Sequence, residues 1–201
     1  MYLLRHGQSY FNLHFNATRV DPRIEDPQLT PLGAQQAVAA AERLAGAALT
    51  RIIVSPYTRA LQTAQPVIAR HRVPVEISPE VRERAAFVCD IGSPPQHLAD
   101  RFPHHDFAHL PSRWWHDGIE PPEVTTGRAN AFRARMALRR DHATTLVVSH
   151  WAFILALTGI SVGNGELLRY DPASPAPATI DWDTRLNLRA AAAASAAGLT
   201  A

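Results

Sequence analysis

The sequence predicts an α/β protein, built as a three-layer α/β/α sandwich around a mostly parallel central sheet. Its 201 residues contain three short runs in which apolar residues are continuous instead of alternating with polar ones. Such runs are typical of strands that are buried on both faces, as in a parallel sheet. Helical patterns lie between and after the runs, and this order of strands and helices favours right-handed crossover connections.

The predicted strands and helices follow one another along the chain. The strands are Tyr2–Leu4, Arg51–Val54 and Thr144–Val148. The first helix begins after Thr30, a capping residue that is followed by a proline suited to the first helical turn, and it runs to about Ala45. Further helices are expected from Ser55-Pro56 to about Arg70, over roughly 124–140, and from about Trp151 onward.

The length of the chain fits one domain, which we assign to residues 1–170. Residues 78–122 are rich in proline, histidine and aromatic residues, and we interpret them as an insertion over the sheet. Residues 171–201 form a C-terminal extension with a strand or turn expected at 179–182. The alanine run at 190–197 is compatible with a terminal helix and equally with a frayed or disordered end.

Composition excludes several classes of function. The formal net charge is only +2 and acidic residues are mixed with basic ones, which is not the pattern of a nucleic-acid-binding protein. The sequence has no lysine, so lysine Schiff-base and P-loop chemistry are both excluded. Cys89 is the single cysteine, which rules out an intrachain disulfide and a multi-cysteine zinc site. No run of eighteen apolar residues occurs, and we expect a cytoplasmic protein that does not bind membranes.

Residues suited to holding phosphate follow each predicted strand. The first strand leads into Arg5 and His6, the second leads into a helix that carries Arg59, and the third leads into His150. The carboxyl ends of parallel strands meet at one edge of a sheet, so we expect these side chains to converge there. Arginine suits a dianion because its planar guanidinium donates paired hydrogen bonds and keeps its charge. The sequence therefore predicts a phosphate site at this edge.

The best-placed nucleophile is a histidine. Candidates include Ser9, Ser55, Cys89 and the histidines, and among these His6 follows its strand directly and precedes Gly7, where the backbone can approach a ligand closely. A neutral imidazole can attack phosphorus when an acceptor such as a backbone carbonyl holds its other ring nitrogen.

Four motifs, in this order and with suitable spacing, resemble those of the histidine phosphatase superfamily, the phosphoglycerate mutase-like family. They are Leu3-Leu4-Arg5-His6-Gly7-Gln8-Ser9 with Asn12, Leu29-Thr30-Pro31-Leu32-Gly33 with Gln36-Ala37, Ser55-Pro56-Tyr57-Thr58-Arg59-Ala60-Leu61-Gln62-Thr63-Ala64, and Val147-Val148-Ser149-His150. Residues 18–27 and 87–92 depart from the usual family patterns, in regions where substrate selectivity usually lies. The reaction is therefore better defined than the substrate.

The resemblance implies a role for each matching residue. His6 would be the nucleophile that becomes phosphorylated. The residues implied in binding the phosphoryl group are Arg5, Asn12, Arg59 and His150. The proton donor of such enzymes is a Glu or Asp that follows the second helix, and Glu83 matches it best, with Glu80 as its rival.

The expected function is hydrolysis of a phosphomonoester on a small metabolite, with no metal ion or other cofactor. A phosphoglycerate mutase-like phosphotransferase and a non-catalytic protein that binds a phosphorylated ligand are the alternatives. The expected partner is the phosphorylated substrate. The sequence is compatible with a homodimer but does not define the oligomeric state.

Other conspicuous residues receive structural interpretations. His97, His104, His105 and His109 match no common zinc spacing, so we do not assign them a metal. Trp114, Trp115, Phe87 and Phe102 would form either an apolar wall over the site or a small core beneath the insertion, and we favour core packing. Cys89 lacks basic neighbours and is interpreted as a packed small residue.

Overall fold

The computed structural model describes residues 1–183. Within this range, five strands form one sheet in the order β3-β2-β4-β1-β5. The strands are β1 (Tyr2–Arg5), β2 (Arg51–Val54), β3 (Val75–Ile77), β4 (Thr145–Ser149) and β5 (Leu167–Arg169). The pairs β1–β4, β4–β2 and β2–β3 are parallel, whereas β5 is antiparallel to β1. The prediction of a mostly parallel sheet is confirmed.

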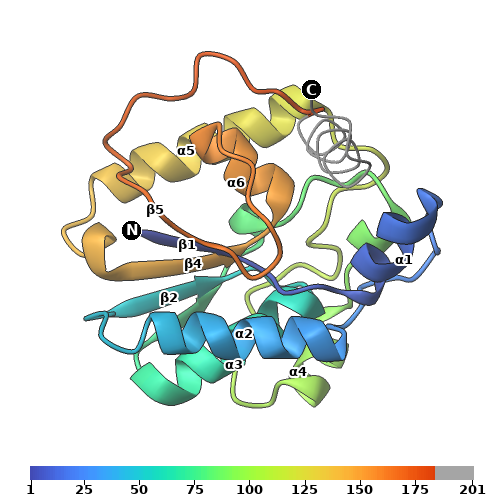
Figure 1. Cartoon of the computed structure of the whole chain (residues 1–201), viewed down its shortest axis with the longest axis horizontal. Coiled ribbons are helices and arrows are strands. Elements are labelled where there is room, and N and C mark those ends of the chain that lie inside the picture. The colour runs from blue at the N-terminus through green and yellow to red at the C-terminus, as the bar shows by residue number, and fades with distance from the viewer. Residues whose placement is uncertain (184–201) are drawn as a thin grey trace, which may run out of the picture.

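Helices cover both faces of the sheet, which confirms the three-layer arrangement (Figure 1). Helices α2 and α3 lie on one face, and α5 and α6 lie on the other. The helices are α1 (Tyr10–Thr18), α2 (Pro31–Arg43), α3 (Thr58–His71), α4 (Pro95–Arg101), α5 (Pro122–Ala137) and α6 (Trp151–Thr158). Short 3₁₀ turns occur at η1 (Pro79–Val81), η2 (Val88–Asp90) and η3 (His142–Thr144).

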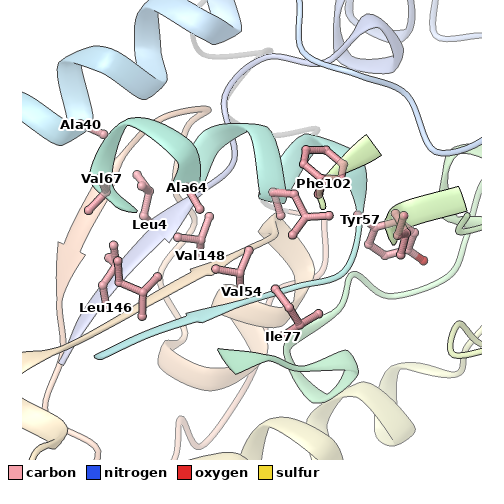
Figure 2. Packing of buried hydrophobic residues seen from close by; sticks show 14 of the residues in the cluster. Leu4, Ala40, Val54, Tyr57, Ala64, Val67, Ile77, Phe102, Leu146 and Val148 are labelled. Atoms are coloured by element: carbon pink, nitrogen blue, oxygen red, sulfur yellow. The ribbon is translucent and has the colours of Figure 1, made fainter. Parts of the chain in front are cut away.

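Alternate strand residues supply the two cores. Leu4 and Val148 are fully buried against α2 and α3, in the core shown in Figure 2. Their chain neighbours Leu3 and Val147 are equally buried on the other face, against α5 and α6. Because successive strand residues point to opposite faces, a strand covered on both sides needs a continuous apolar run. This is the pattern that predicted the sheet.

The segment 78–122 packs closely onto the body of the protein. Leu98, Phe102 and Trp114 are buried in the α2/α3 core. The segment holds two 3₁₀ turns and the seven-residue α4, elements too short to produce a clear helical period in the sequence. Its first residues run along the carboxyl edge of the sheet, since the Ser78 amide donates to the carbonyl of Val54 at the end of β2.

Several elements were not predicted. Helix α1 begins at a capping box in which Ser9 and Asn12 satisfy each other's backbone amides. Strands β3 and β5 contain three residues each; β3 pairs with the preceding strand β2, and β5 pairs with the sequence-distant β1. Of the strand or turn expected at 179–182, the structure shows a turn that begins at Trp182 and no strand. Ile180 and Trp182 instead pack against the α6 side of the sheet. The alanine run at 190–197 lies outside the described residues.

Candidate active site

The register of the sheet gathers the predicted phosphate residues at one edge. Arg5 of β1 pairs with Ser149 of β4, and the amide of His6 donates to the Ser149 carbonyl at 3.0 Å. The next residue along β4 is His150, and its ring centroid lies 5.1 Å from that of His6. Two imidazoles that are 144 positions apart in the sequence therefore lie side by side.

A cavity of about 70 Å³ opens beside His6, several times the space that one water molecule requires. Four of the six predicted site residues line it, namely His6, Asn12, Arg59 and Glu83. The other two, Arg5 and His150, are buried next to His6. The structure thus brings together residues that are spread over 146 positions of the sequence, from Arg5 to His150.

Close backbone packing holds the loop that carries His6. The Gly7 amide donates to the Thr63 hydroxyl at 3.0 Å, which ties the loop to α3. A Cβ atom on Gly7 would lie 2.4 Å from the Gly33 carbonyl oxygen, and one on Gly33 would lie 2.1 Å from the Gln8 carbonyl oxygen. Only glycine permits these approaches. Gly33 lies in α2 and belongs to the motif Leu29-Thr30-Pro31-Leu32-Gly33. This motif therefore supports the loop of the first motif, which carries His6.

The imidazole of His6 is held in one tautomer. Its Nδ1 lies 2.7 Å from the backbone carbonyl oxygen of Gly7, and a carbonyl can only accept, so Nδ1 carries the proton. The lone pair of the neutral ring then belongs to Nε2. The residue is 2% exposed. A proton on Nδ1, held by a backbone carbonyl, is what we expect of a histidine that attacks through Nε2.

His150 is a fully buried, neutral imidazole. Its Nε2 contacts the Ser55 hydroxyl at 2.7 Å, and Tyr57 packs edge-on against its ring at 5.1 Å between centroids. Burial lowers the pKa of His150 well below its ordinary value, and the nearby charge of Arg59 lowers it further. A neutral imidazole has one N–H donor, and this ring contributes no charge near neutral pH.

Arg59 supplies the charge at the floor of the cavity. Its guanidinium donates to the Cys89 carbonyl at 2.8 Å and to Asp90 Oδ1 at 3.0 Å, and it stacks 4.2 Å from the Tyr57 ring centroid. Desolvation opposes this buried charge, but the neighbouring Cys89 and Asp90 outweigh it and place the pKa of Arg59 above its ordinary value. A guanidinium has five N–H donors, so the side chain can bind an anion while it keeps both contacts.

Arg5 and Asn12 are both held by the chain around them. The Arg5 side chain donates to the Val162 carbonyl at 2.7 Å. Asn12 Oδ1 accepts hydrogen bonds from Ser9 and from the amide of Asn164. Because the oxygen of Asn12 is used in this way, its NH₂ group is the end of the side chain that can serve a ligand. Asn12 therefore caps α1 and can also act as the neutral donor.

The structure separates Glu83 from Glu80. Glu83 lines the cavity, and its Oε1 accepts from the amides of Arg84 at 3.0 Å and of Ala152 at 2.9 Å, in the first turn of α6. Glu80 lies outside the cavity lining and pairs with Arg135 of α5. Of the two candidate proton donors, only Glu83 is near His6.

A buried ion network, which was not predicted, holds the segment that carries Glu83. Glu120 is fully buried and binds Arg82 at 2.9 Å and Arg128 at 3.0 Å. Arg128 also donates to the backbone carbonyls of Glu80 and Arg82. These contacts fix the backbone on both sides of Val81, whose carbonyl accepts from the Ser149 hydroxyl. Glu120 and Arg128 belong to no motif that the sequence displays.

The aromatic residues divide between core and cavity. Trp114 and Phe102 are buried in the α2/α3 core, as favoured from the sequence. Phe87 does not follow that expectation, because it lines the cavity and is 37% exposed. Trp115 is partly buried against the same core and also lines a second, outer cavity. Cys89 is buried, and burial raises the pKa of its thiol well above the ordinary value.

Metal-binding side chains do not cluster in the described part of the chain. Across residues 1–183 there is no group of three or more His, Cys, Asp or Glu side chains that could hold a metal ion. His109 instead contacts the Ile77 carbonyl at 2.8 Å. Over the same range, no helix is long and apolar enough to cross a membrane.

The chain belongs to the histidine phosphatase superfamily. The family model described as "Histidine phosphatase superfamily (branch 1)" matches residues 1–179, which is most of the chain. The motifs in the sequence and the arrangement of Arg5, His6, Arg59 and His150 agree with this membership.

Individual relatives match shorter stretches. A stretch of 87 residues, 43% of this chain, is 36% identical to the uncharacterized protein Rv0525 of Mycobacterium tuberculosis and covers 41% of it. A stretch of 83 residues, 41% of this chain, is 37% identical to "Probable phosphoglycerate mutase GpmB" of Proteus mirabilis and covers 37% of it. The matched stretches thus span about two fifths of the length of these curated relatives.

A solved structure supports the fold over a longer range. The mycobacterial glucosyl-3-phosphoglycerate phosphatase Rv2419c, in complex with VO₃, superposes with a TM-score of 0.55. The match covers 83% of this chain and 88% of that chain at 22% identity. At that identity the likeness shows the fold alone.

Proposed function

We propose that this protein is a phosphatase that hydrolyses phosphomonoesters through a phosphohistidine formed at His6. The observation that carries the proposal is the contact between His6 Nδ1 and the Gly7 carbonyl, which assigns the lone pair to Nε2 of a ring that lines the cavity. The superfamily membership of residues 1–179 and the phosphatases among proteins of the same fold support it.

In the first step, His6 Nε2 attacks phosphorus and the bond between phosphorus and the ester oxygen breaks. Glu83 gives its proton to the departing oxygen, so the product is an alcohol and not an alkoxide. Arg59 and Arg5 neutralise the phosphoryl oxygens, while His150 and Asn12 donate neutral hydrogen bonds to them. Phosphoryl transfer depends mainly on positioning and charge of this kind.

In the second step, water replaces His6 on phosphorus. Glu83, now ionised, takes a proton from the attacking water, and the phosphorus–nitrogen bond breaks. Inorganic phosphate leaves, and both His6 and Glu83 return to their starting states. No metal ion or other cofactor takes part in this scheme, and the substrate is a phosphorylated small molecule.

The test is release of phosphate from a panel of phosphorylated metabolites and from 4-nitrophenyl phosphate, with a chelator present. We expect activity to survive the chelator and to fall at least about a thousandfold in His6→Ala, because the nucleophile is lost. Acid-labile phosphate should be trapped on the native protein and not on His6→Ala. Activity that disappears with the chelator, or that survives His6→Ala, would contradict the scheme.

Two results would favour the alternatives to a phosphatase. Transfer of phosphate between positions of a substrate, with dependence on a bisphosphorylated primer, would indicate a mutase. Vanadate binding without turnover of any ester would indicate a protein that only binds phosphorylated ligands. The expectations of a cytoplasmic protein and of a homodimer stay predictions.

A further inference from the structure

Three aromatic side chains line the cavity together with the residues proposed to bind phosphate. Phe11, Phe87 and Trp151 line it, together with the apolar side chains of Ala86 and Ala152. The indole N–H of Trp151 already donates to the Ser161 hydroxyl at 2.9 Å. These rings therefore offer carbon surface to the group that is esterified to the phosphate.

Phe87 is an exposed ring held in a fixed position. Its centroid lies 5.2 Å from that of Phe11 and 4.9 Å from that of Phe15, so two rings support it from α1. Despite this packing, 37% of the residue is exposed. An exposed aromatic side chain that is ordered by its neighbours can bind a ligand at a low cost in conformational entropy.

One carboxylate connects this ring to the phosphate site. Asp90 Oδ2 accepts from the Phe87 amide at 3.1 Å, and Asp90 Oδ1 accepts from Arg59 at 3.0 Å. A buried residue therefore fixes the backbone of Phe87 relative to the guanidinium that is proposed to bind phosphate. The arrangement suits a ligand with a phosphate at one end and a flat or apolar group adjacent to it.

The two kinds of alcohol that such a substrate could contain differ in how favourably they would bind to the three rings. A hydroxyl of a sugar or polyol placed against the three rings would lose its water without gaining a hydrogen bond, which is costly. An aromatic or similarly apolar group would be removed from water and would pack against Phe87.

We propose that the site selects phosphomonoesters in which the alcohol carries an aromatic or comparably apolar group, and that Phe87 determines this selectivity. The proposal rests on the phosphate site described under the proposed function and names the substrate class of that site. It does not require turnover, because it concerns binding.

Binding of two non-hydrolysable phosphonates tests it, with titration calorimetry as the readout. Benzylphosphonate presents a ring and 2,3-dihydroxypropylphosphonate presents a polyol, while both carry the same anionic group. We expect the native protein to bind the benzyl compound at least about tenfold more tightly, which corresponds to one good aromatic contact. In Phe87→Ala this preference should fall to about twofold or less, while the affinity for the polyol compound changes by less than about twofold.

Ile91→Ala is the matched control. Ile91 is 36% exposed and lies on the same segment as Phe87, but it lines the outer cavity and not the inner one. Its loss should leave the benzyl preference unchanged. Equal affinity of the native protein for both compounds, a preference that survives Phe87→Ala, or an equal loss in Ile91→Ala would each overturn the proposal.

The outcomes also separate this inference from the proposed function. If the native protein binds the benzyl compound preferentially but does not hydrolyse benzyl phosphate, the substrate class stands and the phosphatase proposal fails. If it hydrolyses benzyl phosphate and glycerol phosphate equally and binds both phosphonates equally, the phosphatase proposal stands and the selectivity fails. If neither phosphonate binds, the selectivity fails, and phosphate release from the ester panel decides the phosphatase proposal separately.

Discussion

The Nε2 atom of His150 lies 2.7 Å from the hydroxyl oxygen of Ser55, and both side chains are fully buried. Ser55 follows β2 and His150 follows β4, so the contact joins two neighbouring strand ends. Within residues 1–183, the other ring nitrogen of His150 is buried without a hydrogen-bond partner. When the Ser55 hydroxyl donates to Nε2, the proton of His150 lies on Nδ1, where it can be offered to a phosphoryl oxygen.

Replacement of Ser55 by alanine should therefore weaken oxyanion binding. We expect Ser55→Ala to bind vanadate about fivefold to tenfold more weakly, the usual worth of one lost hydrogen bond. Ser149→Ala is the control, because Ser149 is an equally buried serine that donates to the Val81 carbonyl instead of contacting His150. Equal vanadate affinity in the two variants would mean that Ser55 does not act through His150.

The burial of His150 predicts that stability falls on mild acidification. Desolvation, with Arg59 and His6 nearby, holds the pKa of His150 well below its ordinary value of about 6.5. As the pH drops below that value, the unfolded chain takes up a proton that the folded chain does not, so folding is disfavoured. This group should cost about 1 kcal/mol between pH 6.5 and 5.5.

Urea unfolding of the native protein and of His150→Gln at several pH values measures that loss. The variant should be less sensitive to pH over this interval. His105, whose pKa is also lowered by burial, contributes equally to both proteins. If the free energy of unfolding depends on pH in the same way in the native protein and in His150→Gln, then His150 is not the group responsible for the loss.

The position of Glu83 predicts an effect that depends on the leaving group. Glu83→Gln cannot protonate the departing oxygen, so kcat for an alkyl phosphate should fall about a hundredfold or more. 4-Nitrophenyl phosphate, which needs little protonation, should lose less in the first step. Glu80→Gln should behave like the native protein, because Glu80 pairs with Arg135 away from the cavity. A larger loss in Glu80→Gln than in Glu83→Gln would reverse the assignment.

Removal of the Glu120 charge should destabilise the protein strongly. Glu120→Gln leaves Arg82 and Arg128, which are 15% and 10% exposed, without their shared carboxylate. A buried charge that loses its partner typically costs about 3 kcal/mol or more. Glu123→Gln, at an exposed position in the first turn of α5, should cost less than about 0.5 kcal/mol. Chemical unfolding of the two variants provides the comparison, and similar free energies would argue against a structural role for the network.

The contact between Gly33 and Gln8 predicts that an added methyl group displaces the loop of His6. In Gly33→Ala the new Cβ would lie 2.1 Å from the Gln8 carbonyl oxygen, so the backbone must move and vanadate affinity should fall about tenfold or more. Gly127→Ala adds the same group within α5, where the new Cβ would meet no atom within 4 Å apart from the nearby chain of the helix itself. That variant should be neutral or gain up to about 1 kcal/mol from better helix propensity. Unchanged vanadate binding in Gly33→Ala would show that the loop tolerates the displacement.

Much of the fold could be predicted because its signals are local. The continuous apolar runs of β1, β2 and β4 report burial on two faces, and the Thr30-Pro31 cap marks the start of α2. Strands β3 and β5 give no such signal, because three residues cannot establish a pattern, and β5 in addition pairs with β1, which is far away in the sequence. The two 3₁₀ turns and α4 in residues 78–122 could not be predicted either, because they are also too short to establish a pattern.

The sequence by itself determined the fold class, the family and which residues we propose to bind the phosphoryl group, since motifs are contiguous and their chemistry belongs to residue types. Only the tertiary structure decided which carboxylate is near His6, and that Phe87 lies at the cavity while Trp114 and Phe102 lie in the core. Those outcomes depend on which surfaces the segment 78–122 buries, a free-energy balance summed over contacts such as the Arg82–Glu120 pair, whose partners are 38 residues apart. No short stretch of sequence contains both partners of such a contact, so no local pattern could reveal it.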